Sequence, residues 1–278
     1  MLRFIDTTEK EKIQKSGYMY EHLLCFYSMT TEKTALLNET FPVFINNDNE
    51  ADVILFGLRE RYESENSYLS ELSELSLTSV NIVAPVALKQ PNITTISEDF
   101  DYHIDVQQFN FSLKGNKYKR LRYTVKQLQK LKYNQKINRR LTPSHLHILS
   151  RHMARHDLAV WDFEELISLE AFFREHNHGF MMEAYLGNRL IGFDVVDFFE
   201  HNKIMVVPLG IYAEEPRVSD FLMYENLKYA KENGYKWLDV GLTCNDYGIQ
   251  RFKEKWMAKP KFKIFIQKMQ TAGKNATS

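Results

Sequence analysis

The last third of the chain, residues 179–266, constrains the fold more than any other segment. Period-two alternation and turn residues predict three consecutive strands there. A helix, a strand, a short loop, a short helix and a final strand follow. Together with earlier predicted strands at 80–86 and 102–106, this order predicts an α/β fold built on a mixed α+β sheet.

The three consecutive strands are bounded by clear turn signals. Strands 180–186 and 189–198 flank Gly187-Asn188, a pair typical of a two-residue hairpin turn. A second turn precedes strand 203–212, which predicts an antiparallel meander.

The helices that follow the meander carry recognisable end signals. Ser219 predicts the N-cap of the longer helix, with Asp220 in the first turn, and Gly234 predicts its end. Strand 237–240 comes next. In the short helix 249–257 the apolar side chains share one face, so the helix is expected to pack against a core.

The rest of the chain is predicted to form two further parts. Earlier helices are predicted at 8–26 and 67–75, earlier strands at 43–45 and 53–58, and later helices at 118–131, 143–157 and 163–176. We therefore predict an N-terminal domain at 1–112, a basic connecting helix at 113–140 and a C-terminal domain at 141–278.

Charge is divided unevenly along a chain whose formal net charge is zero. Residues 1–105 hold 8 Lys+Arg and 18 Asp+Glu, which leaves 28 and 18 for the remainder. Basic residues continue through 112–140 with no acidic residue among them. RNA phosphates would be attracted to such a segment. Attraction between the acidic and basic parts of the chain, or a solvated helix face, explains the same pattern.

The composition favours a folded protein outside the membrane. The chain is 44% hydrophobic and 26% charged, and it has no apolar run long enough for a transmembrane helix. Its start lacks the pattern of a secretion signal. Cys25 and Cys244 lie far apart, which argues against a disulfide framework. We expect a cytoplasmic protein with no integral membrane association.

Three segments together resemble the GNAT superfamily of acyltransferases. They are 111–115 followed by Leu121-Arg122, then 230–241 (AKENGYKWLDVG), and 248–256 (GIQRFKEKW). More narrowly, they resemble the C-terminal catalytic domain of phosphatidylglycerol lysyltransferases, and the last segment is similar to a motif of Fem-type aminoacyl-tRNA-dependent transferases. The resemblance implies tandem GNAT-like halves, of which the N-terminal one is reduced or divergent.

The resemblance also implies an acyltransferase that forms an amide with an amine. Acetyl-CoA-dependent members bind pyrophosphate with a glycine-containing turn, whereas residues 217–222 lack glycine and Asp220 would repel phosphate. Aminoacyl-tRNA is therefore the expected donor, with tRNA as a partner, a soluble small-molecule or peptide amine as acceptor, and no cofactor. A donor on coenzyme A or acyl-carrier protein is one alternative, and a non-catalytic RNA- or protein-binding module is another.

The same resemblance gives Lys253 the role of partner for an oxyanion or a leaving group. The alternative is a solvated surface lysine. Tyr247 would protonate the leaving group and Asp246 would bind the acceptor amine, although residues of this kind also form turns. Donor binding is predicted for Arg217, Phe252, Arg251, Lys255, Arg122 and Lys119.

Other polar residues give weaker signals. Asp239 is expected to orient the loop that follows it. Asp194 and Asp197 face opposite sides of a strand, so one of them could look into the cleft as a base. His152 and His156 have a metal-binding spacing, but the glutamate of an H-E-x-x-H site is missing, and no metal is expected.

Overall fold

The computed structural model describes residues 2–4, 33–37, 41–45, 50–54, 72, 77–156, 179–199, 203–243 and 245–270. The chain forms two compact units, one from residues 1–101 and 261–278, the other from 102–260. The predicted boundaries at 112 and 140 both fall inside the second unit. The backbone N–H of Val106 donates a hydrogen bond to Lys236 O within this unit, and the basic helix packs into the core of the same unit.

Strands dominate the described part of the first unit. They are β1 (Leu2–Phe4), β2 (Lys33–Leu37), β3 (Phe41–Ile45), β4 (Glu50–Ile54), β5 (Ser79–Ala84), most of β6 (Ile93–Asp105) and most of β12 (Lys259–Met269). Their order is β1-β2-β3-β4-β5-β12-β6, with β4 and β5 parallel. The strands predicted near 43, 53 and 80 are confirmed. The helices predicted at 8–26 and 67–75 lie outside the described residues, apart from Leu72, which is helical.

The second unit contains the predicted meander. Strands β8 (Phe180–Leu186), β9 (Arg189–Phe199) and β10 (Ile204–Tyr212) are antiparallel neighbours, and β11 (Trp237–Leu242) pairs with β10 in parallel. These strands lie in the order β6-β11-β10-β9-β8-β7. The sequence reading missed β7 (Tyr133–Asn138), because this edge strand is short and polar and lacks a period-two apolar signal.

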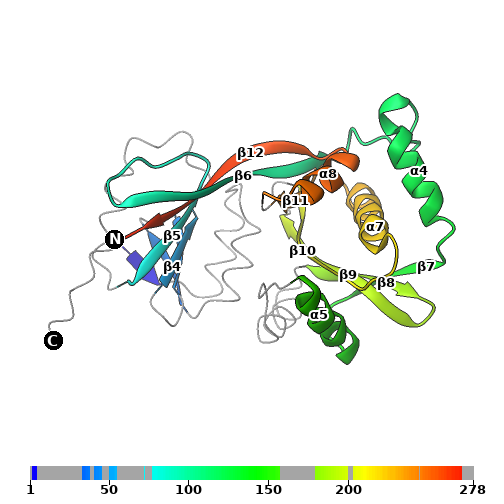
Figure 1. Cartoon of the computed structure of the whole chain (residues 1–278), viewed down its shortest axis with the longest axis horizontal. Helices are drawn as coiled ribbons and strands as arrows, with labels where there is room; N and C mark the ends of the chain where they lie inside the picture. Colours follow the sequence, from blue (N-terminus) through cyan, green and yellow to red (C-terminus); the bar gives the residue numbers. More distant parts are fainter. Residues whose placement is uncertain are drawn as a thin grey trace. The chain divides into compact units, whose positions relative to one another are not determined.

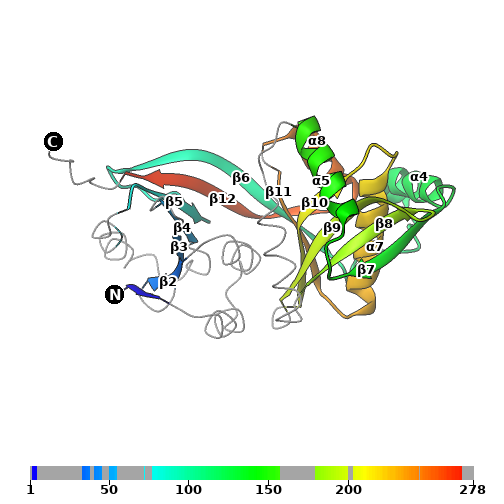
Figure 2. The same cartoon turned by 90° about the horizontal axis from the view of Figure 1, so that it is seen from below.

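Helices cover both faces of the meander. Figure 1 shows α7 (Val218–Glu232) on one face of β8 and β9, and α5 (Pro143–His156) on the other, and Figure 2 gives the same arrangement from below. Helix α4 (Lys119–Leu128) buries Leu121, Val125 and Leu128 in the core that it shares with α7. The helix predicted at 118–131 is therefore confirmed.

Helix α7 begins earlier than the sequence predicted. Its N-cap is Arg217, at φ +63°, and Phe221 N bonds to Arg217 O at 2.9 Å. The prediction that Ser219 is the cap was wrong, because the turn before the helix already places Val218 in the helical conformation. Helix α8 (Tyr247–Lys255) also begins two residues before its predicted start.

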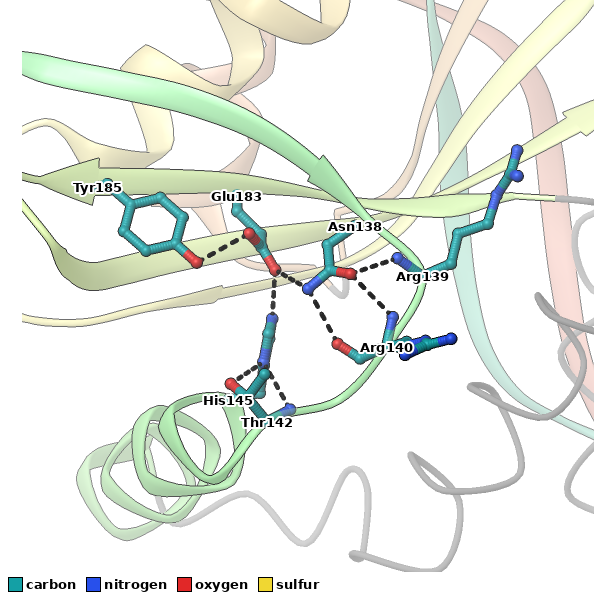
Figure 3. Close-up of polar contacts among 7 residues, drawn as sticks. All are labelled: Asn138, Arg139, Arg140, Thr142, His145, Glu183 and Tyr185. Carbon is teal, nitrogen blue, oxygen red and sulfur yellow. Dashed lines mark hydrogen bonds and ion pairs between the residues drawn. The ribbon is translucent and has the colours of Figure 1, made fainter.

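A buried glutamate fastens the start of α5 to the sheet. Glu183 on β8 bonds to His145 of α5 at 2.8 Å, to Asn138 of β7 at 2.9 Å and to Tyr185 at 2.9 Å (Figure 3). The Thr142 N–H lies 3.0 Å from His145 Nδ1, so that nitrogen accepts and Nε2 donates to Glu183. These bonds fix the turn between β7 and α5.

Candidate functional site

The second unit contains a cavity of about 400 Å³ where β10 and β11 separate. The paired register of these strands ends at Val206 and Asp239, and β10 then has a bulge before Leu209. Pro208 lies in this bulge and has no N–H to donate to a neighbouring strand. The strand separation leaves a space that side chains from β9, β10, β11, α7 and α8 line.

The cavity wall combines apolar surface with a few polar groups. Its apolar side chains include Val207, Met223, Val240, Ile249 and Phe252, and its polar side chains are Asp194, Tyr212, Ser219 and Lys253. A mostly apolar space with few polar side chains is typical of small-molecule sites, in which the polar groups fix the orientation of the ligand.

Lys253 lies in the cavity wall, with only 5% of the residue exposed. Its Nζ donates to Gly241 O at 2.7 Å and to Leu242 O, and lies 6.0 Å from the centre of the Tyr102 ring. Asp239 accepts from Gly241 N at 2.7 Å, so it orients the following loop as predicted. Lys253 is therefore not a solvated surface residue, and its chemical role stays a prediction.

The two other predicted catalytic residues lie at the start of α8. Asp246 is its N-cap and accepts from Ile249 N at 2.9 Å, which is the turn role that the sequence left open. Tyr247 is 70% exposed. Of the first residues of α8, Gly248 and Ile249 line the cavity. The acid role of Tyr247 and the amine-binding role of Asp246 remain predictions.

Asp220 does not face a phosphate site with an uncompensated charge. It is buried, and its carboxylate forms ion pairs with Lys255 and, at 3.4 Å, with Arg217. Trp256 Nε1 also donates to it at 2.9 Å. Two cations thus offset the charge that was expected to repel phosphate at this position. The same contacts occupy two residues that the sequence assigned to donor binding.

The remaining predicted donor-binding residues are spread over the unit. Phe252 lines the cavity beside Lys253. Arg251 is exposed and packs on Tyr247, with 5.5 Å from its guanidinium carbon to the ring centre. Arg122 donates to the carbonyls of the loop before α4, and Lys119 is exposed on α4. The cavity thus brings together one predicted donor-binding residue, Phe252, and the predicted catalytic residue Lys253.

The sequence named Asp194 only as one of two candidate bases, and this residue lines the cavity. It is 2% exposed and accepts from Tyr212 Oη at 2.8 Å and from Asn226 Nδ2 at 2.6 Å. Burial raises the pKa of Asp194 to about 7, although these two hydrogen bonds act to lower it. Burial and the neighbouring Asp194 carboxylate raise the pKa of Tyr212 as well.

The absence of a side chain at Gly210 leaves space for the hydrogen bond between Tyr212 and Asp194. A Cβ at this position would lie 1.9 Å from Tyr212 Oη and 2.7 Å from Asp194 Oδ1. Both distances are far below van der Waals contact, so a residue with a side chain would displace the pair. Isolated glycines in strands often mark such close approaches, which is the signal that could have pointed to this site.

His152, from the histidine pair with metal-binding spacing, contacts the end of β10. His152 Nδ1 lies 3.4 Å from both the backbone N and O of Tyr212. The side chain of His156 lies outside the described residues. In the described part of the chain no helix is long and apolar enough to cross a membrane.

Comparison with solved structures identifies the fold. Over 95% of this chain and 93% of the other, the chain matches the C-terminal domain of a candidate lysylphosphatidylglycerol synthetase from Agrobacterium fabrum, with TM-score 0.67 and 13% identity. FemX matches with TM-score 0.59 and 12% identity over 96% of each chain. A tandem GNAT protein from the clavulanic acid biosynthesis pathway matches with TM-score 0.58 and 10% identity, over 96% and 97%.

No protein-family model matches the sequence, and a comparison with curated proteins finds no match. The structural matches extend over both units, and at these identities they establish the fold alone. The chain therefore has a tandem GNAT-like fold, as the resemblance of its motifs implied.

Proposed function

We propose that the protein is an acyltransferase that moves an activated aminoacyl group from aminoacyl-tRNA to an amine and forms an amide. One observation carries the proposal: a buried ammonium, Lys253, and a buried carboxylate, Asp194, line one cavity of a GNAT-like fold. Acyl transfer to an amine needs a partner for the oxyanion and a group that handles the protons of the amine. The cavity offers one group of each kind.

The proposed chemistry is a direct displacement at an ester. The amine nitrogen attacks the ester carbonyl carbon, and the carbonyl oxygen becomes an oxyanion that Lys253 stabilises. Collapse of the tetrahedral intermediate breaks the C–O bond to the terminal ribose, whose hydroxyl takes up a proton that the amine has lost. The bonds from Lys253 to Gly241 O and Leu242 O hold the ammonium in place before the substrate arrives.

Exposed basic residues support a nucleic acid as the donor carrier. The sequence holds no Asp or Glu between Asp105 and Asp157. Within this stretch, α4 exposes Lys119, Arg120 and Lys126 to solvent. Lys and Arg side chains that contact nucleic-acid phosphates neutralise their charge, and the affinity for the nucleic acid then falls steeply as the salt concentration rises.

Donor identity can be tested with two labelled substrates. The protein is incubated with aminoacyl-tRNA and, separately, with acyl-CoA, together with a mixture of small amines and peptides. We expect an amide product from aminoacyl-tRNA that disappears after ribonuclease treatment. Lys253→Met should reduce its rate by about 10²-fold or more, whereas Lys259→Met, at an exposed position, should not. A ribonuclease-insensitive product made from the thioester contradicts the tRNA donor.

A donor on coenzyme A is the second candidate, and one observation favours it. Arg217 and Lys255 flank Asp220 at the start of α7, so this helix N-terminus carries a net positive charge. Helix N-termini with such a charge attract phosphate groups. The thioester arm of the same experiment decides between the two donors.

A further inference from the structure

We propose that Asp194 anchors a primary ammonium group of the substrate, so that the cavity takes a ligand with a cationic amine on a short aliphatic chain. This inference deepens the proposed function, because an aminoacyl donor and an amine acceptor both carry such a group. It concerns binding alone and can be measured without any turnover.

Among the residues that the structure describes, the immediate surroundings of Asp194 supply hydrogen bonds but no opposite charge. In the part of the chain that the structure describes, its two partners are the Tyr212 hydroxyl and the Asn226 amide, both neutral donors. By contrast, Asp220 on α7 has two cationic partners. A buried carboxylate is costly unless a cation or a proton compensates it.

One side-chain atom of the neighbouring Asn226 lacks a hydrogen-bond partner among the described residues. Asn226 is fully buried, its Nδ2 donates to Asp194, and its Oδ1 has no hydrogen-bond partner among the described residues. Buried polar atoms are nearly always satisfied in a complete site. An ammonium carries three N–H donors, so it is the ligand group that suits a carboxylate with neutral neighbours.

The distribution of charge in the cavity suggests how a ligand lies in it. Among the described residues that line it, Asp194 and Lys253 are the two charged side chains, one negative and one positive. Met223 and Phe252 contribute apolar wall between β10, α7 and α8. A ligand with an ammonium and a carbonyl oxygen matches this pair of charges, and its aliphatic part matches the wall.

Binding can be measured by isothermal titration with two amines and their neutral counterparts. Hexylamine represents an isolated acceptor amine and hexanol is its control. Norleucine amide represents the aminoacyl part of a donor and hexanamide is its control. At about pH 7.5, we expect at least one amine to bind roughly tenfold more tightly than its neutral counterpart, as one charge-assisted contact allows. The amine that shows the preference identifies which substrate Asp194 holds.

Two variants make the binding test specific. Asp194→Asn keeps the size of the side chain and removes its charge. This variant should therefore bind the amine no more tightly than the neutral counterpart. Asp197→Asn is the matched control, because Asp197 is buried on the same strand but does not line the cavity. It should retain the preference. Circular dichroism checks that both variants fold.

The pH dependence of binding gives an independent readout. For hexylamine, whose ammonium persists over this range, affinity for the wild-type protein should fall about tenfold from about pH 8 to about pH 6, because Asp194 then gains a proton. Equal binding of amines and neutral controls, or a preference that survives Asp194→Asn, overturns the inference. If amines bind as expected while neither donor yields a product, the proposed function fails and the ammonium site stands.

Discussion

The second unit contains two buried carboxylates on neighbouring strands that face opposite sides of the sheet. Glu183 on β8 faces α5, where His145 bonds to it, and Asp194 on β9 faces α7, where Asn226 bonds to it. Glu183 lies opposite Phe193 in the strand register, which places Asp194, one residue further along, on the other face. Similar burial in one sheet thus gives two different environments.

The difference lies in the number and nature of the partners. Burial alone would raise the pKa of Glu183, but hydrogen bonds from His145, Asn138 and Tyr185 outweigh it, so this pKa is lowered. Asp194 has two neutral donors and a cavity beside it, and its pKa is raised to about 7. A saturated carboxylate holds a structure together, whereas an under-compensated one beside a cavity is suited to a ligand.

The largest expected difference between the two carboxylates is in activity. Asp194→Asn should lower kcat/KM for amide formation by about 10³-fold, roughly 4 kcal/mol, because the variant loses both the ion pair with the substrate and the carboxylate that handles the protons of the amine. Glu183→Gln should stay within about threefold of wild type when measured well below its melting temperature, since Glu183 does not line the cavity. Steady-state kinetics on both variants provides the test, and equal losses would remove the functional distinction.

The pH dependence of stability should have opposite signs at the two positions. Folded Asp194 keeps its proton up to about pH 7, whereas an unfolded Asp loses it near 3.8, so the folded state binds more protons in between. This group therefore lowers the free energy of unfolding as pH rises across that window, by at most about 4 kcal/mol. The contribution of Asp194 to the free energy of unfolding is fully present below its unfolded pKa of 3.8 and is lost above its folded pKa of about 7.

Glu183 acts in the reverse direction because its folded pKa is lowered. Its stabilising contribution is present above the unfolded pKa of 4.5 and is lost as pH falls through the lower folded value. Denaturant titrations from acidic to neutral pH on wild type, Asp194→Asn and Glu183→Gln separate the two. Asp194→Asn should remove the decline toward neutral pH, and Glu183→Gln should remove the loss in acid. Unchanged profiles in both variants would contradict the assignment.

At neutral pH, removal of the Glu183 charge should destabilise the protein more than removal of the Asp194 charge. Glu183→Gln leaves His145 and Asn138 without their charged acceptor, and the cost of breaking such a buried network is about 3 kcal/mol. Asp194→Asn removes a charge without a cationic partner among the described residues and should be neutral or stabilising. Thermal melts at one pH measure both, and a larger loss for Asp194→Asn would reverse the comparison.

The two carboxylates also illustrate which features of the fold and of the candidate site could be predicted from the sequence. The meander, α7 and α8 were predictable because their apolar periods and turn residues are local signals. Lys253 was reached through the motif in which it lies. Asp194 and Glu183 could not be ranked from their sequence neighbours, since their environments depend on α7, α5 and β7, which are distant in sequence.

Departures from the predicted elements have a similar origin. Strand β7 is visible only from its pairing with β8, because its own residues are polar. The charge of Asp220 looked repulsive in the sequence, and only the folded chain brings Lys255 to it. Ion pairs and edge strands depend on contacts between distant segments, which a local pattern does not contain.

The smallest effects are expected from substitution of the tyrosine that donates a hydrogen bond to each carboxylate. Tyr212→Phe removes one of the two donors to Asp194, which should raise the pKa of Asp194 further and move the acidic limb of the activity profile to higher pH. Tyr185→Phe removes one of three donors to Glu183 and should cost about 1 kcal/mol of stability while leaving the activity profile in place.

These paired tyrosine variants test whether the two hydroxyls, each bonded to a buried carboxylate, have different effects on the pH dependence of activity. Tyr185 has a pKa raised to about 12, through burial and its bond to Glu183, so it stays a donor throughout the working range of pH. The pKa of Tyr212 is likewise raised, and its hydroxyl also remains protonated. Any shift of the activity profile in Tyr212→Phe therefore reports on Asp194 itself. An acidic limb that stays fixed in Tyr212→Phe, or moves equally in Tyr185→Phe, would show that Asp194 does not control it.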